Sequence, residues 1–439
     1  MRKRFAGLAL SLAFLTGCGT SGWLPGLSDG RFDTSAKGGK DWTVFVYMAA
    51  DNSLSDVADI DLNEMEAGLS SDRIRFVALV DQAKQGDSRI LEIQPDPKGM
   101  NEILVSRDVD DGGAVIPASR EVNTGSPETL KRFLDWGTKR YPSRRSMLVM
   151  WNHGGATFSD PDHLKSFCWD DQSKSHLTLV DLWRTTQHLA TRTQFDVTGF
   201  DTCLLGHLET AYQLKRVSKF LVSSERVSPG HGWDYQALAR TLSRKPEIYP
   251  RELATAIARD YQAFYQKEGE QTTISVADLE KVGDRLVPAV NALAKNLTKL
   301  VSNSSTRTPL TDTLSQALSA ASGSGERNAI DLGYFGDLLQ KNPKLPKETR
   351  DLAAKMTQEL RRSVETNLTT GLPGEKYQGL KIYFSWRLNK AYADPSHQFF
   401  GTQAWTDFLK AYDKAPSPGN APTNPFPNPG FPSPGLPPM

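Results

Sequence analysis

The sequence predicts an α/β fold in which a mostly parallel sheet is flanked by helices. Between residues 42 and 225, short apolar runs such as WTVFVYMA, IRFVALV and SMLVMW alternate with longer amphipathic segments. The apolar runs are continuous, as in strands whose two faces are both covered. The amphipathic segments begin with residues that cap helices, such as Ser126 before Pro127. This alternation places helices on both faces of a parallel sheet.

The predicted elements follow one another in a regular order. The expected strands are WTVFVYMA, IRFVALV, SMLVMW, FDVTGF and FLVSS, and the expected helices are DVADIDLNEMEAGL, SPETLKRFLDWGTKRY, TLVDLWRTTQHLA and LLGHLETAYQLKRV. Residues 88–122 depart from this order, because SRILEIQPDPKGMNEILVSRDV is typical of a hairpin-like pair of short strands. We therefore expect the sheet and its helices to lie within residues 41–245.

After about residue 245 the pattern becomes predominantly helical. The helical segments are ELATAIARDYQAFYQKEG, LEKVGDRLVPAVNALAKNLTKLV, LTDTLSQALSAAS and KETRDLAAKMTQELRRSVETNL. Two β-prone runs interrupt them, at 272–279 and 379–386, and the second is apolar enough to join the central sheet. Residues 246–413 are therefore expected to pack on the first region. Residues 414–439 hold ten of the 26 prolines, which predicts a disordered tail.

The amino-terminal segment is typical of a bacterial lipoprotein. Residues 1–17 contain a basic start, MRKR, and the short apolar run FAGLALSLAFL, which are the first two parts of a signal peptide. The residues LTGC resemble a lipobox, in which Cys18 becomes the lipidated first residue. Residues 18–40 would then tether an extracytoplasmic domain to a bacterial membrane. The alternative is an ordinary secretory signal with a chance cysteine.

Charge and cysteine content argue against several classes of protein. Lys and Arg total 52, Asp and Glu total 51, and the net charge is +1. No overall field therefore favours nucleic acid or an acidic partner. Apart from Cys18 the chain has only Cys168 and Cys203, too few for a disulfide scaffold. One bridge between these two is possible, but a thiol kept free outside the cytosol suggests a chemical role.

Two motifs place reactive residues after predicted strands. SMLVMWNHGGATF puts His153, Gly154 and Gly155 after one strand, and FDVTGFDTCLLGHLETAYQL puts Cys203 after the next. Ligands of parallel sheets bind beyond the carboxyl ends of the strands, so the two side chains are expected to meet. Cys203 is also expected in the first turn of a helix, where free amides favour thiolate. The alternative is that Cys203 is a core residue and His153 a hydrogen-bonded loop residue.

These motifs resemble the clostripain-like cysteine peptidases, relatives of caspases, gingipains and legumain. The resemblance covers residues 41 to about 412, on the stretches DWTVFVYMAADNSLSDVADIDLNEME, LVMWNHGGA, GFDTCLLGHLETAYQLK, SPGHGWDY, TISVADLEKV and GLKIYFSW. It implies a caspase-like fold and a dyad of His153 and Cys203 that hydrolyses peptide bonds in a protein or peptide substrate. The attack would build a tetrahedral oxyanion, with the backbone amides of Gly154 and Cys203 as its donors.

The resemblance also implies a pocket for a basic residue before the cleaved bond. The family has an aspartate in this pocket two residues before the nucleophile, and Asp201 stands there. A buried carboxylate makes directional bonds with a guanidinium. The alternative is that Asp201 caps the helix expected at 203–215. Where the family usually has an acidic residue this chain has His231, in PGHGW, so a preference for Arg or Lys would be weakened, pH-dependent or altered.

Residues 156–176 are expected to form a long loop. Relatives are often activated by self-cleavage after a basic residue of the matching loop, which makes Lys165 and Lys174 candidates. Ordinary solvated lysines are the alternative. Cys168, in the same loop, would have no chemical role.

No metal or cofactor is assigned. The chain has no EF-hand-like spacing. Cys203 and His207 lie four residues apart, but no further Cys or His nearby would complete a site, so His207 is expected to be a packing residue. We expect a monomeric endopeptidase. The alternative is a catalytically silent surface lipoprotein that binds peptides at the same place.

Overall fold

The computed structural model describes residues 39–101, 103–155, 166–187, 195–326, 328–389, 392 and 403–415. Predictions for the signal peptide, Cys18, the tether, Lys165 and residues 416–439 lie outside this part of the chain.

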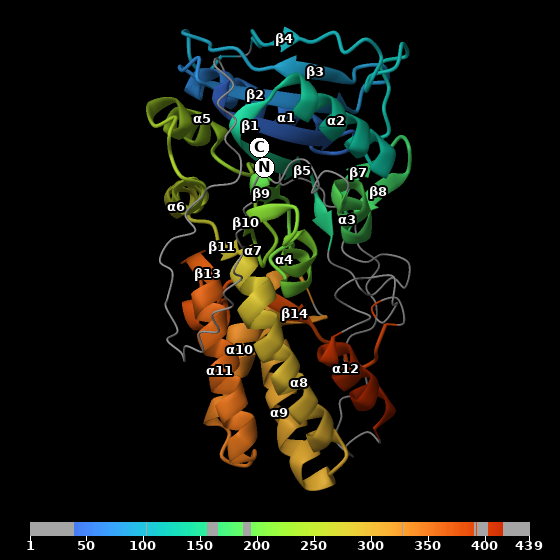
Figure 1. Ribbon diagram of the computed structural model, residues 1–439, viewed down its shortest axis with the longest axis vertical. Helices are drawn as coiled ribbons and strands as arrows, with labels where there is room; N and C mark the ends of the chain where they lie inside the picture. Colours follow the sequence, from blue (N-terminus) through green and yellow to red (C-terminus); the bar gives the residue numbers. More distant parts are fainter. Residues whose placement is uncertain are drawn as a thin grey trace, which may run out of the picture. The chain divides into compact units, whose positions relative to one another are not determined.

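A large mixed sheet forms the centre of the fold (Figure 1). Within the described residues its order is β13-β11-β10-β9-β5-β1-β2-β3-β4. The five strands from β10 to β2 are parallel, whereas the pairs at both edges are antiparallel. The strands are β1 (Lys40–Ala50), β2 (Ile74–Gln82), β3 (Arg89–Glu92), β4 (Arg107–Asp108), β5 (Ser143–Trp151), β9 (Phe195–Asp201), β10 (Ser218–Ser223), β11 (Thr272–Asp278) and β13 (Val364–Thr370). The mostly parallel sheet and the hairpin β3–β4 agree with the sequence prediction.

Helices cover both faces of this sheet, which explains why its central strands are mostly apolar and buried. Along β1, Val44 and Val46 belong to one buried cluster, and Phe45 and Tyr47 belong to the other. One face is covered by α1 (Ser55–Gly68), α5 (Tyr235–Arg244) and α6 (Pro250–Glu268). The other face is covered by α2 (Pro127–Arg140), α3 (Leu179–Gln187), α4 (Leu208–Leu214) and α7 (Leu279–Lys281). Alternate residues of each strand therefore lie in different cores.

The carboxyl-terminal half is predominantly helical and packs on the second of these cores. Buried residues of α8, α10 and α12, such as Leu293, Phe335 and Trp405, belong to the same cluster as Phe45 of the sheet. The elements are η1 (Val282–Leu286), α8 (Val287–Val301), α9 (Ser304–Ala321), η2 (Ser322–Ser324), α10 (Leu332–Lys341), α11 (Lys347–Ser363), η3 (Gly374–Lys376) and α12 (Ala404–Lys414). None of the helices in the described part of the chain is long and apolar enough to cross a membrane.

Two strand assignments from the sequence need correction. The run at 379–386 does not join the central sheet: its strand, β14 (Lys381–Tyr383), pairs with β12 (Ala329–Asp331) in a separate antiparallel sheet. The strand that joins the central sheet is β13, which the sequence suggested was the end of a helix. In VETNLTT the β-branched residues favour an extended chain. Because these residues directly follow a helical pattern, the sequence did not show where the helix ends and the strand begins.

The segment expected to be a loop, 156–176, contains strands. A three-stranded sheet joins β6 (Gly154–Gly155), β7 (Ser166–Asp170) and β8 (Ser175–Thr178). Because β7 pairs with the two glycines that follow His153, this small sheet fixes the chain just after the histidine.

Candidate active site

Two neighbouring parallel strands bring His153 and Cys203 to the same end of the sheet. Strands β5 and β9 are paired in register, with Trp151 opposite Asp201. His153 and Cys203 each lie two residues beyond this pair. The segments that follow the two strands are still hydrogen-bonded to each other, since the Asn152 amide donates to the Asp201 carbonyl at 3.3 Å.

Gly154 lies directly against the backbone of Cys203. A Cβ atom on Gly154 would come within 2.0 Å of the Cys203 carbonyl oxygen and 2.7 Å of its nitrogen. The Gly154 amide also bonds the Cys203 side chain, and the Ser228 amide donates to the sulfur at 3.3 Å. The sulfur therefore has two backbone N–H donors. The close approach of residue 154 to the Cys203 backbone is possible only for glycine.

Cys203 is not in a helix, contrary to the sequence prediction. Residues 202–207 form a loop, and α4 begins only at Leu208. Leu204 has a φ of 64°, in the left-handed region, so a regular α-helix cannot run through this loop. Gly206 is pressed against the backbone of Ser224 and Glu225, where a Cβ would meet atoms at 2.8–2.9 Å. The LLGHLETAYQL pattern suggested a longer helix because it does not reveal this close approach.

Cys203 and His153 are both held toward their neutral forms. Burial raises the pKa of the Cys203 thiol, although the Ser228 and Gly154 amides act in the opposite direction. Burial likewise lowers the pKa of His153, with Asp171 partly opposing it. The expected thiolate at a helix terminus is therefore replaced by a neutral thiol near a neutral imidazole.

Ser53 contacts the candidate histidine. Its Oγ shares a hydrogen bond of 2.8 Å with Nε2 of His153. Ser53 follows β1, and the loop there is held by Asn52, whose side chain donates to the carbonyls of Ala49 and Trp169 at 2.9 and 2.8 Å. The sequence analysis missed Ser53. The signal that could have found it is its place beyond the carboxyl end of the first strand.

Asp201, at the end of β9, does not cap a helix. Its Oδ2 accepts hydrogen bonds from the Trp233 amide at 3.1 Å and from the Tyr235 hydroxyl at 2.9 Å. Gly232 packs against the carboxylate, where a Cβ would lie 2.7 Å from Oδ2. Burial raises the pKa of Asp201 from 3.8 to about 7. The capping alternative is therefore wrong, and the carboxylate is buried at the same end of the sheet as Cys203.

Two acids of α1 accompany Asp201, and the sequence analysis did not identify them. Asp61 accepts a hydrogen bond from Trp151 Nε1 at 2.6 Å, and Glu64 accepts one from the Tyr235 amide at 2.9 Å. Burial raises the pKa of Asp61 well above its ordinary value, and that of Glu64 to about 7. The charged groups that shift Asp61, Glu64 and Asp201 are themselves all acidic. A cation would relieve this repulsion.

His231 is exposed beside this acidic group. It precedes Gly232, which contacts Asp201. Its ring packs edge-on to Phe264, with the two centroids 6.1 Å apart. A basic side chain thus stands next to the region where the resemblance leads one to expect a second acid.

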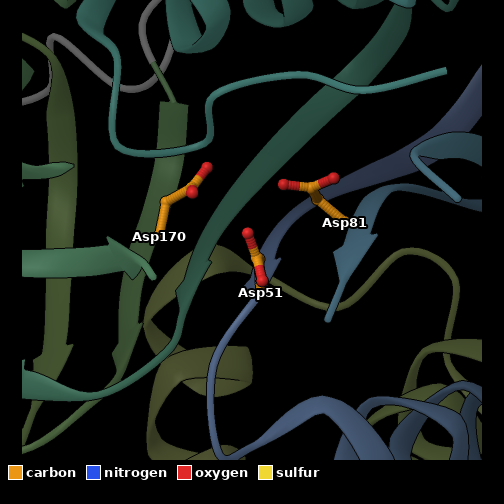
Figure 2. Close-up of side chains that lie close together, drawn as sticks. All are labelled: Asp51, Asp81 and Asp170. Carbon is orange, nitrogen blue, oxygen red and sulfur yellow. The ribbon is translucent and has the colours of Figure 1, made fainter. Parts of the chain in front are cut away.

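A second group of carboxylates lies where β1, β2 and β7 end (Figure 2). Asp51, Asp81 and Asp170 are buried and have oxygens within 4.8 Å of one another, close enough to share a cation. Burial raises the pKa of Asp51 to about 6 and that of Asp81 to about 8. Bonds from Ser88 and Thr124 also satisfy these oxygens.

The remaining predicted positions lie on the small sheet. Lys174 is exposed in the turn between β7 and β8, so self-cleavage there stays a prediction. Cys168 is fully buried in the core rather than placed in a loop. Neither Cys168 nor Cys203 forms a disulfide, so the bridge considered from the sequence is absent.

A family model described as the clostripain family matches residues 46–375. Clostripain of Hathewaya histolytica is 29% identical over 215 residues, which make up 45% of this chain and 41% of that protein. The match therefore spans less than half the length of this relative.

Two solved structures share the fold. An inactive zymogen C11 protease from Parabacteroides distasonis is 19% identical, with a TM-score of 0.58 over 84% of this chain and 98% of that one. A secreted C11 cysteine protease from Bacteroides thetaiotaomicron, in complex with an irreversible peptide inhibitor, is also 19% identical, with a TM-score of 0.58 over 85% and 99%. The caspase-like arrangement of the sheet is therefore the fold of the C11 proteases. Since the family model covers most of the chain, this protein belongs to the clostripain family of cysteine peptidases.

Proposed function

We propose that the protein is a cysteine endopeptidase in which Cys203 is the nucleophile and His153 the general base. The observation that supports this most is the packing of Gly154 on the Cys203 backbone, with two amides directed at the sulfur. This contact lies between Cys203 and the residue after His153, which supports a catalytic pair of these two side chains. The test is a cleavage profile on fluorogenic peptides that vary the residue before the cut.

Because the Cys203 thiol and the His153 imidazole both start neutral, a proton must leave the sulfur when it attacks. His153 removes the thiol proton as the sulfur attacks the carbonyl, and the resulting imidazolium then protonates the leaving amine. For Nδ1 to accept this proton, Nε2 must carry its own hydrogen, which it would donate to the Ser53 hydroxyl 2.8 Å away. The backbone amides of Gly154 and Cys203 would stabilise the oxyanion. Water then hydrolyses the acyl-enzyme, with His153 again as the base.

Asp201 supports a preference for Arg or Lys before the cleaved bond. It is a buried acid two residues from the nucleophile, and its charged neighbours Glu64 and Asp61 are acids. A guanidinium or ammonium group would replace this repulsion by attraction. A positive charge on the exposed His231, which precedes Gly232 beside Asp201, would weaken this preference.

We expect the change Gly154→Ala to lower peptidase activity by about 100-fold. Its methyl group would overlap the Cys203 carbonyl and nitrogen, so one of the two chains must move away. A displacement of about 1 Å at reacting groups costs on the order of 100-fold in rate. The measurement is kcat/KM on the best peptide substrate.

Gly155→Ala is the matched control for this prediction. The added methyl would meet only ordinary contacts, the nearest at 3.6 Å from the Trp169 ring, so activity should stay within about two-fold of the wild type. Equal activity of the two variants would show that the close contact at Gly154 has no role in catalysis.

We also propose that Cys18 carries a lipid that anchors the mature protein outside the bacterial cytoplasm. The amino-terminal sequence supports this, and the structurally similar protease from Bacteroides thetaiotaomicron is described as secreted. In the producing bacterium, Cys18→Ser should shift the protein from the membrane fraction to the soluble one. An unchanged membrane fraction would exclude this anchor.

A further inference from the structure

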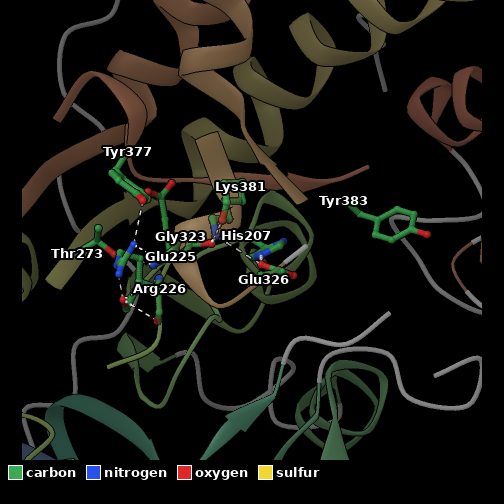
Figure 3. Close-up of polar contacts among 12 residues, drawn as sticks. His207, Glu225, Arg226, Thr273, Gly323, Glu326, Tyr377, Lys381 and Tyr383 are labelled. Atoms are coloured by element: carbon green, nitrogen blue, oxygen red, sulfur yellow. Dashed lines mark hydrogen bonds and ion pairs between the residues drawn. The ribbon is translucent and has the colours of Figure 1, made fainter. Parts of the chain in front are cut away.

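A buried cluster of charges includes His207, the last residue of the 202–207 loop that carries Cys203. Figure 3 shows His207 with Glu326 and Lys381. His207, four residues after the cysteine, is fully buried and its Nε2 lies 2.7 Å from Glu326. The ammonium group of Lys381, also fully buried, lies 3.7 Å from the same carboxylate and bonds the hydroxyl of Ser324. Glu326 therefore links an imidazole of the catalytic region to a lysine of the carboxyl-terminal region.

The cluster is joined to the Cys203 loop through the backbone as well. The Lys381 amide donates to the Gly206 carbonyl at 3.0 Å, and His207 and Lys381 form an isolated parallel β-bridge. On the other side, the amides of Leu204 and Gly206 donate to Arg226 and Ser224 at 3.0 and 2.7 Å. The loop is thus clamped between β14 and the chain that follows β10.

More buried charges surround this contact. Asp331 raises the pKa of Glu225, whereas a hydrogen bond with Glu225 acts to lower the pKa of Asp331, and both acids oppose the effect of burial on Lys381. Glu209 lies 3.6 Å from His207 Nδ1 and accepts a hydrogen bond from the Tyr392 hydroxyl at 2.9 Å. Burying so many ionisable groups costs more folding free energy than apolar packing would. Such clusters can instead specify one local conformation of the chain.

We propose that Lys381, Glu326 and His207 are positioning residues that hold the 202–207 loop so that the Cys203 thiol faces His153. The carboxyl-terminal region is then part of the catalytic apparatus, because it supplies Lys381 and Glu326. This inference rests on the proposed function, since it assigns the cluster a role in the same reaction.

The test compares Lys381→Met with Arg145→Met in the full chain. Arg145 is also a buried base, 8% exposed, but it lies at the start of β5, away from His153, and bonds the Glu247 carbonyl at 3.0 Å. We expect Lys381→Met to lower kcat by about ten-fold or more with KM within about two-fold, because the nucleophile is displaced while the pocket remains. Arg145→Met should lower the melting temperature but leave kcat within about two-fold.

A second variant and a second readout keep the inference testable if Lys381→Met folds poorly. Glu326→Gln preserves size and hydrogen bonding but removes the charge that Lys381 and His207 share, so kcat should fall to a value between wild type and Lys381→Met. The rate at which iodoacetamide alkylates Cys203, followed by mass spectrometry, should fall in both cluster variants and not in Arg145→Met. Wild-type kcat and alkylation rates in the cluster variants would overturn the inference, as would a loss shared equally by Arg145→Met.

The alkylation readout also separates this inference from the proposed function. If the wild-type protein cleaved no peptide, the peptidase proposal would fail. The alkylation rates would still show whether the cluster positions the thiol.

Discussion

Replacing Cys203 by alanine is expected to lower kcat/KM for peptide cleavage by about four orders of magnitude or more, to the background rate. His153→Ala should cost nearly as much, because a nucleophile and its base act as one unit. The double variant should then be little worse than either single one. The measurement is initial rates on Arg and Lys fluorogenic peptides at saturating and limiting concentrations.

The chain offers a matched control in its other internal thiol. Cys168 is buried in the core, and Cys168→Ala makes the same side-chain change as Cys203→Ala but outside the proposed site. It should destabilise the fold by about 1 kcal/mol and leave kcat/KM near that of the wild type. Cleavage that survives in Cys203→Ala, or disappears in Cys168→Ala, would remove Cys203 as the nucleophile.

Asp201→Asn is expected to affect stability and specificity separately. It should stabilise the free protein at alkaline pH, and it should abolish the preference for Arg and Lys. Asparagine keeps an oxygen that can accept from the Trp233 amide and the Tyr235 hydroxyl, but it carries no charge to bury. The loss of activity should therefore be confined to basic substrates, whereas a uniform loss would indicate a purely structural role.

The sign of the stability effect follows from the raised pKa. The folded protein favours the protonated acid, so the stability linked to Asp201 is complete below pH 3.8 and is lost as the pH rises toward about 7. This difference corresponds to about 4 kcal/mol, at about 1.36 kcal/mol per pKa unit. Asp201→Asn should therefore gain stability over the wild type progressively between these pH values, as measured by urea unfolding. A stability difference that does not change with pH would contradict the burial of this charge.

The central strands, and the position of His153 and Cys203 at one end of the sheet, could be predicted because their signals are local. WTVFVYMA and SMLVMW are apolar runs that only a doubly covered strand explains, and β1 and β5 lie there. Since adjacent parallel strands end at the same edge, the positions of His153 and Cys203 in the sequence were enough to place them together.

Features that depend on contacts between distant segments could not be predicted. The place of Ser53 after β1 indicates the edge of the sheet at which it lies, but not its contact with His153. Nothing in the local sequence of α1 shows that Glu64 contacts Tyr235. The sequence predicts a helix at 203–215, but residues 202–207 form a loop, in which Gly206 is constrained by the distant chain at Ser224. Strand β13 likewise owes its place to pairing with β11, a tertiary contact that overrides the helical periodicity before it.

The proposed partnership of His153 and Cys203 is tested most directly by the rate of Cys203 alkylation as a function of pH. Iodoacetamide would be reacted with the wild type and with His153→Ala from about pH 5 to pH 9, and labelling of Cys203 followed by mass spectrometry. A neutral imidazole that accepts the thiol proton should make the wild type at least about ten-fold faster near neutrality. The variant should react appreciably only at the higher pH at which its thiol, whose pKa burial raises, ionises by itself. Superimposable profiles for the two proteins would show that the histidine does not act on this sulfur.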